Sequence, residues 1–481
     1  MLSAHLTPAE LFGGFVAVST LIALRQWRLG ILLAFLAAIA QDPIRKITPG
    51  TPGVMAVSSA PIWVAVILAG LLARPRSLAA LRRAFPDISG WMLLLTLSLI
   101  PATLVLFQHG TQMWRLAALG LYGYLTALGS LGVGIFFVRR PQDLRRLIVV
   151  YVVVTTAFLS GVFLEHLETF PQSRMLGTWA LGANWDRYTA GVTLGLMTGF
   201  YRSPDLMSWH AASVVILALS LALQERRKRA LPLIAFAGIA GVCLVLGGRR
   251  KMAMMPIIWF AVMTLNLARQ GRLSRVFALG AAGTMAAVAL FFGTTEMGVS
   301  SDYFTYMSSS AQDAPGRLLT VFTNVWRTYN QWGLLGLGIG TATQGARYLG
   351  LPAETWQETG LEKLMVELGL AGLICAIALM ARIGWTLLKQ VRRQELHPAP
   401  ILHLGFAGFA AANLASYLVS QQAYGDPIVL FGTGLTVGIA LSGAHWRYRF
   451  EAARAQTRAR FAHRVRGRDR RGSVEPPPPS V

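Results

Sequence analysis

The residues of this chain best suited to chemistry are basic and lie in one short segment, residues 247–251 (GGRRK). Arg249, Arg250 and Lys251 follow one apolar segment, and the next begins at once with Met252. A guanidinium group binds anionic oxygens through paired hydrogen bonds and always keeps its charge, which suits it to phosphate. We therefore predict a phosphate or pyrophosphate site at Arg250 or Arg249, with Lys251 beside it.

Carboxylates in a later segment supply a candidate base. Glu358, Glu362 and Met365 recur at i, i+4 and i+7, so a helix would place both carboxylates on one face, just before the apolar segment that begins at Leu364. A carboxylate near lipid headgroups and arginines can accept a proton from a sugar hydroxyl. The alternative is structural, because acidic residues also gather at helix N-termini, where the helix dipole stabilises negative charge.

The composition indicates what kind of protein positions these residues. Of 481 residues, 54% are hydrophobic and 14% are charged, with 44 Lys or Arg against 21 Asp or Glu. A soluble domain carries about 25% charged residues, so the sequence predicts a membrane protein. The net charge of +23 comes from arginines between and after the apolar blocks, which indicates anionic lipid and not nucleic acid as the partner.

Apolar segments long enough to cross a bilayer recur along the chain. We predict thirteen, near residues 11–24, 29–40, 54–73, 91–107, 116–138, 147–164, 209–223, 231–247, 252–268, 276–292, 364–381, 401–420 and 428–446. A fourteenth, residues 188–201, is short and glycine-rich, and fits a full span, a half-helix or a re-entrant segment. The expected fold is all-α and polytopic, with roughly 12 to 14 transmembrane helices.

The distribution of Lys and Arg predicts the orientation. Strongly basic loops alternate with less basic ones, which places the basic loops and the C-terminal tail in the cytoplasm. The expected organisation is an N-terminal bundle (1–292), a large periplasmic loop with amphipathic helices (293–363), C-terminal spans (364–446) and a basic tail with a proline-rich end (447–481).

Several basic residues then lie on the periplasmic side, against this charge rule. Besides residues 249–251, they are Arg45, Lys46, Arg174, Arg187, Arg317 and Arg327. A lone Arg45 or Arg174 fits a side chain that snorkels to the membrane interface or caps a helix. We expect the clustered residues to bind an anionic ligand, because their placement otherwise opposes membrane insertion.

Known nucleotide and metal motifs are missing from the sequence. It contains no Walker A segment, no H-E-x-x-H, no G-x-S-x-G and no D-x-D that would chelate a metal on a nucleotide sugar. We therefore expect no cofactor and no catalytic metal.

Two stretches carry a family resemblance. Residues 315–340 (PGRLLTVFTNVWRTYNQWGLLGLGIG) and 358–373 (ETGLEKLMVELGLAGL) resemble the O-antigen ligase and O-antigen polymerase superfamily of bacterial envelope glycosyltransferases. The matching positions are Arg317 in the loop, the glycine series Gly336, Gly338 and Gly340, and Glu367, Gly369 and Gly372 in the following span. The GGRRK segment resembles the small-residue-plus-Arg motif of an earlier span in that family.

The resemblance implies an inverting, metal-independent transfer of glycan from an undecaprenyl-pyrophosphate carrier. Arg317 and Arg250 (or Arg249) would hold the pyrophosphate, and Arg187, Lys251, Arg327 and Glu362 would bind pyrophosphate or glycan. Ligases of this family have a histidine near the end of the loop, proposed to activate the acceptor. This chain has Glu358 there, which favours a polymerase with Glu358 as base.

We therefore expect an inner-membrane enzyme that polymerises lipid-linked oligosaccharide repeat units into exopolysaccharide or O-antigen at the periplasmic face. Its partners would be the lipid-linked oligosaccharide, membrane lipids and other polysaccharide-assembly proteins. The alternatives are a ligase that transfers glycan to a lipid or protein, a transporter or flippase of lipid-linked glycans, and a non-catalytic subunit of an envelope assembly complex.

Overall fold

A computed structural model describes residues 7–71, 75–189, 192–296, 298–308, 310–343, 346, 357–391 and 400–443. Within these ranges the regular secondary structure is helical apart from one small hairpin, so the predicted all-α fold class is confirmed. The predicted basic tail, residues 447–481, lies outside the described residues.

The helices follow one another along the chain, mostly through short turns. They are α1 (Pro8–Arg25), α2 (Trp27–Ile47), α3 (Ala60–Leu71), α4 (Pro75–Ala84), α5 (Pro86–Phe107), α6 (Trp114–Phe137), α7 (Pro141–His166), α8 (Pro204–Ala222), α9 (Arg227–Leu246), α10 (Arg250–Arg269), α11 (Leu273–Glu296), α12 (Ser301–Ser308), α13 (Ser310–Trp332), α14 (Gly360–Val391) and α15 (Pro400–Val419). A further apolar helix is Pro427–Gly443. Short 3₁₀ turns lie at Gly53–Val57, Thr111–Met113, Trp179–Leu181 and Ala423–Gly425.

Twelve segments of the described chain are long and apolar enough to cross a membrane, and Pro427–Gly443 is a shorter apolar helix. These thirteen correspond one to one with the thirteen predicted segments. The agreement arises because a bilayer requires about 20 consecutive apolar residues per helix, and few other structures need such a run.

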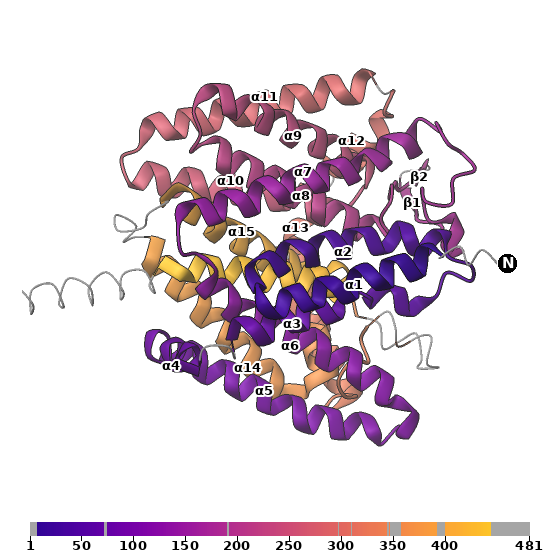
Figure 1. Ribbon diagram of the computed structural model, residues 1–481, viewed down its shortest axis with the longest axis vertical. Coiled ribbons are helices and arrows are strands. Elements are labelled where there is room, and N and C mark those ends of the chain that lie inside the picture. Colours follow the sequence, from indigo (N-terminus) through magenta and orange to yellow (C-terminus); the bar gives the residue numbers. More distant parts are fainter. Residues whose placement is uncertain are drawn as a thin grey trace, which may run out of the picture.

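Helix α8 forms the centre of the bundle. All of its residues are buried, and it packs against α7, α9, α10 and α15. A helix that is apolar on every side is stable only when neighbours surround it. Figure 1 shows α8 in the middle of a set of long helices that run side by side across the view.

The segment at residues 188–201 is not a membrane helix. It contributes to a two-stranded antiparallel sheet, in which β1 (Asp186–Thr189) pairs with β2 (Val192–Gly195) and Arg187 lies opposite Leu194. The interpretations as a full helical span or a half-helix are wrong. Tyr, Thr and Val favour extended backbone in these strands, and Gly195 and Gly199 disfavour a helix.

The bundle has two distinct ends. At one end, which we call the hairpin end, the β1–β2 hairpin and α12 lie where α8, α10 and α14 begin. At the other, the basic end, α5, α7, α9 and α11 begin, and Arg145 forms an ion pair with Glu225 at 2.6 Å. Figure 1 shows the hairpin on the right and α4 on the left.

Helix α13 occupies much of the long segment between α11 and α14. Its Leu319, Phe322 and Trp326 follow one another at intervals of three and four residues, and all three are exposed. An apolar face at this spacing is typical of a helix that lies in the membrane interface. The stretch for which the sequence predicts an amphipathic helix lies within α13.

Candidate functional site

Arg249 occupies a buried position at the start of α10. Its side chain is 3% exposed, its guanidinium lies 2.9 Å from the carboxylate of Asp205, and the Trp185 ring centroid is 5.1 Å away. Gly248 allows this turn because its φ of +57° is favourable only for glycine. Burial lowers the pKa of Arg249 below its ordinary value, whereas Asp205 opposes that shift.

Asp205 holds a second cation. Lys251 Nζ lies 3.3 Å from the other oxygen of the Asp205 carboxylate and donates hydrogen bonds to Ser420 Oγ and to Gln422 Oε1, the latter at 2.7 Å. Asp205 stands in the first turn of α8, where the helix dipole stabilises negative charge. One carboxylate thus joins residues 249–251 to α8.

Arg250 and Arg187 lie farther out. Arg250 is half-buried, with its guanidinium 4.8 Å from the centroid of the Tyr306 ring on α12. Arg187 is exposed on β1, and its charge contributes to the lowered pKa of Arg249. The structure therefore separates the two arginines that the sequence left equivalent. Arg249 is buried in an ion pair, and Arg250 is nearer the surface.

A second buried charge network lies beside the first. Lys46 Nζ donates hydrogen bonds to the carbonyl oxygens of Met175, Gly199 and Tyr201, at 3.2, 3.0 and 2.7 Å. Arg202 donates to Asp42 at 2.7 Å and forms an ion pair with Asp426.

The site residues predicted from the sequence did not include Asp42, Arg202 or Asp205. The available signal was the presence of ionisable residues at the ends of apolar segments, where they are rare and have partners. Together with Arg249, Lys251 and Asp426, these three side chains form a network at the hairpin end in which positive and negative charges are paired. Arg187 and Arg250 add positive charge at its surface.

Glu358 and Glu362 do not share a helical face, so that prediction is wrong. Helix α14 begins at Gly360, after Glu358, whose side chain is exposed. Glu362 is buried and accepts a hydrogen bond from the Thr359 amide at 2.9 Å, while Thr359 Oγ1 accepts one from the Glu362 amide. This reciprocal pair is a capping box, which fixes the start of a helix.

Glu358 nevertheless lies next to the loop that holds Lys251. Its carbonyl oxygen accepts a hydrogen bond from the Gln421 amide at 2.8 Å, and Gln421 stands between the two side chains that Lys251 contacts. The loop thus brings the predicted base and the predicted cations to one region.

The two arginines predicted in the large loop, Arg317 and Arg327, both lie in α13. The backbone of Arg317 lies in α13, but its side chain is outside the described residues. Arg327 is exposed on α13, which packs against α14 and α15. Its role stays a prediction.

The glycines of the resemblance motifs allow close backbone packing. A Cβ at Gly336 would lie 2.4 Å from the carbonyl oxygen of Val366, and one at Gly369 would lie 2.5 Å from that of Leu334. Both residues have positive φ, and Gly369 interrupts the helical geometry of α14. The loop that carries Gly336, Gly338 and Gly340, which we call the glycine loop, therefore packs closely against a break in α14. Residues larger than glycine at Gly336 or Gly369 would clash with the backbone there.

Glu367 ties this loop to α6. It is completely buried, accepts a hydrogen bond from the Tyr124 hydroxyl at 2.6 Å and another from the Ala342 amide at 3.2 Å, and lies 3.8 Å from Lys363 Nζ. A carboxylate so deeply buried is stable only with such partners.

A long cavity of about 490 Å³ begins beside Glu367. Its walls come from α6, α10, α14, α15 and Pro427–Gly443, and most of its lining is apolar. Lys363, Glu367 and Tyr417 line it toward the hairpin end, whereas Asn266 and Arg269 line it toward the basic end. Such a cavity is suited to an apolar chain with a polar head.

No protein-family model matches the chain, and no curated protein sequence matches it.

Proposed function

We propose that the protein polymerises polyprenyl-pyrophosphate-linked oligosaccharide repeat units into exopolysaccharide or O-antigen. The observation that carries the proposal is one loop that borders both the charged networks and the long cavity. Ser420 and Gln422 contact Lys251, Asp426 pairs with Arg202, and Tyr424 lines the cavity. A lipid pyrophosphate needs this combination of clustered cations and an adjoining apolar space.

The proposed chemistry is an inverting displacement at the anomeric carbon of the donor glycan. Glu358 accepts the proton of the acceptor hydroxyl, whose oxygen forms the new glycosidic bond as the bond to the pyrophosphate oxygen breaks. Negative charge then collects on the departing pyrophosphate. Arg250, Arg187 and Arg317 stabilise this charge, and preorganised cations of this kind lower a barrier by several kcal/mol, on the order of 3 for one donor.

The remaining residues position this site. Arg249 and Lys251 are anchored by Asp205, so they fix the start of α10 and with it the direction of Arg250. Arg327 and the exposed apolar face of α13 would hold that helix at the membrane surface near the substrate headgroup. Glu362 acts as a helix cap, which removes it from the ligand-binding set.

The proposal places the hairpin end in the periplasm of a bacterial inner membrane. Arginines are dense in the turns at the basic end, which favours a cytoplasmic location for that end. The donor would then enter with its glycan on the periplasmic side and its lipid in the bilayer.

Transport of a lipid-linked glycan is the second candidate function. Lys363 and Glu367 are ionisable, belong to a membrane-spanning helix and line the long cavity, as residues on a transport path do. A transporter would move the lipid without making a new glycosidic bond, whereas a ligase would transfer one glycan block to a different acceptor.

The test is incubation of the purified, reconstituted protein with polyprenyl-pyrophosphate-linked repeat units from its own host. A ladder of multiples on a gel or by mass spectrometry is expected. Transfer of a single block to another acceptor would establish a ligase, and unchanged glycan that has crossed the membrane would establish a transporter.

A further inference from the structure

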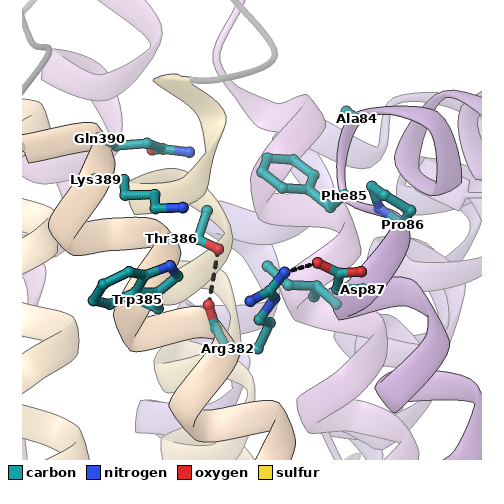
Figure 2. A pocket seen from close by; sticks show the side chains of 10 residues that line it. Ala84, Phe85, Pro86, Asp87, Arg382, Trp385, Thr386, Lys389 and Gln390 are labelled. Atoms are coloured by element: carbon teal, nitrogen blue, oxygen red, sulfur yellow. Dashed lines mark hydrogen bonds and ion pairs between the residues drawn. The ribbon is translucent and has the colours of Figure 1, made fainter.

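A second pocket, of about 240 Å³, lies at the basic end, away from the charged networks. It is formed between the start of α5 and the last turns of α14. Figure 2 shows Arg382, Thr386 and Lys389 on the α14 side, with Phe85 and Asp87 facing them. The proposed glycosyl transfer uses none of these residues.

Among the described residues that line the pocket, two are cations and one is a carboxylate. Arg382 forms an ion pair with Asp87, and Lys389 lies 5.0 Å from the centroid of the Trp385 ring. The guanidinium has five N–H donors, so an ion pair through one nitrogen leaves donors for a further acceptor. Arg382, Lys389 and Asp87 together carry a net charge of +1, which one further negative charge would neutralise.

The pocket lies at the level expected for lipid headgroups. Helices α5 and α14 are both long enough to cross the membrane, and the pocket lies where one begins and the other ends. Trp385 is 51% exposed, and tryptophan is enriched at the level of the headgroups.

The neighbouring helix α4 has the character of an interfacial helix. It is only 10 residues long, with Leu81 buried and Arg82 and Arg83 exposed. Basic residues beside a membrane surface attract anionic lipid, by about 1 kcal/mol each. The surroundings of the pocket therefore favour the same class of ligand as its interior.

We propose that this pocket binds the phosphodiester headgroup of an anionic phospholipid in the leaflet at the basic end. The phosphate lies between Arg382 and Lys389, the glycerol backbone passes Trp385, and the acyl chains continue along the exposed sides of α5 and α14. A zwitterionic phospholipid carries the same phosphate together with a cation, which the pocket would repel.

The experiment compares phosphatidylglycerol with phosphatidylcholine, added to the delipidated full-length protein in detergent. Bound lipid is counted by native mass spectrometry. The variants are Arg382→Gln and Lys389→Gln, and the matched control is Arg145→Gln. Arg145 is also an exposed, ion-paired arginine at the basic end, but it lies on α7, outside the pocket.

Wild type and Arg145→Gln should bind phosphatidylglycerol in preference to phosphatidylcholine. Each pocket variant should bind phosphatidylglycerol about tenfold more weakly, the effect of losing one charge-assisted hydrogen bond. Lys389→Gln leaves the Arg382–Asp87 ion pair intact, so a loss in that variant does not come from misfolding at the pair. Equal binding of both lipids by wild type, or full binding of phosphatidylglycerol by both pocket variants, would overturn the proposal.

Discussion

The guanidinium of Arg249 lies 2.9 Å from the carboxylate of Asp205, and both side chains are almost completely buried. Lys251 shares that carboxylate at 3.3 Å. This arrangement separates the three consecutive cations of the chain by task. Arg249 and Lys251 tie α10 to α8, and Arg250 remains nearer the surface, where the proposed substrate phosphate would arrive.

Replacing Asp205 should destabilise the protein. Asp205→Asn leaves the buried Arg249 and the half-buried Lys251 without this counter-charge, and breaking a buried pair in this way costs about 3–5 kcal/mol. Thermal unfolding in detergent should show a marked fall in Tm. Asp186→Asn is the control, because Asp186 is exposed on β1. An unchanged Tm in Asp205→Asn would mean that the ion pairs do not hold α8 to α10.

Alanine at Arg250 and alanine at Arg249 should have different effects on turnover and Tm. Arg250→Ala should reduce turnover by about 10²- to 10³-fold, the loss expected for one donor to a developing negative charge, with little change in Tm. Arg249→Ala should lower Tm as well, because it leaves Asp205 buried with only Lys251. Measuring turnover and Tm on the same preparations tests this, and the reverse pattern would exchange the two roles.

A side chain added to the glycine loop should clash with α14. Gly336→Ala would bring a methyl group 2.4 Å from the Val366 carbonyl oxygen at a φ of +71°, so it should destabilise the protein by at least about 1–3 kcal/mol. Gly316→Ala is the matched control. Gly316 is helical with nothing within 4 Å of a new Cβ, and alanine there should stabilise by up to about 1 kcal/mol. Equal Tm values for both variants would contradict the close packing.

The Tyr124–Glu367 hydrogen bond should contribute measurably to stability. Tyr124→Phe removes the donor and leaves a buried carboxylate with one partner fewer, at a cost of about 1.5–3 kcal/mol. Tyr188→Phe is the control, since Tyr188 is 77% exposed on the hairpin. Chemical denaturation of both variants compares them, and a Tyr124→Phe protein as stable as wild type would show that the hydroxyl is dispensable.

The sequence predicted the spanning helices because their length and apolarity are local properties. It also marked residues 249–251, since three adjacent cations between apolar segments are unusual. It could not supply Asp205, which is 44 residues away along the chain and meets Arg249 only through the packing of α8 on α10. Partners of this kind depend on the tertiary structure.

Two local signals were present but misinterpreted. Thr359 and Glu362 have the spacing of a capping box, which places the helix start after Glu358. The prediction of a shared face for Glu358 and Glu362 assumed that the helix begins before Glu358. In residues 188–201, the β-branched and aromatic residues indicated strands, but the block is also uncharged after Arg187, which fits a membrane segment.

In the proposed reaction, the hairpin end cleaves a polyprenyl-pyrophosphate donor while it forms a glycosidic bond. The most direct measurement is the release of free polyprenyl pyrophosphate by the purified protein in nanodiscs, counted against glycosidic bonds formed. We expect one pyrophosphate lipid to be released for each bond, and release to be nearly lost in Arg250→Ala and in Glu358→Gln. Folded wild-type protein that binds the donor but releases no pyrophosphate lipid would contradict it.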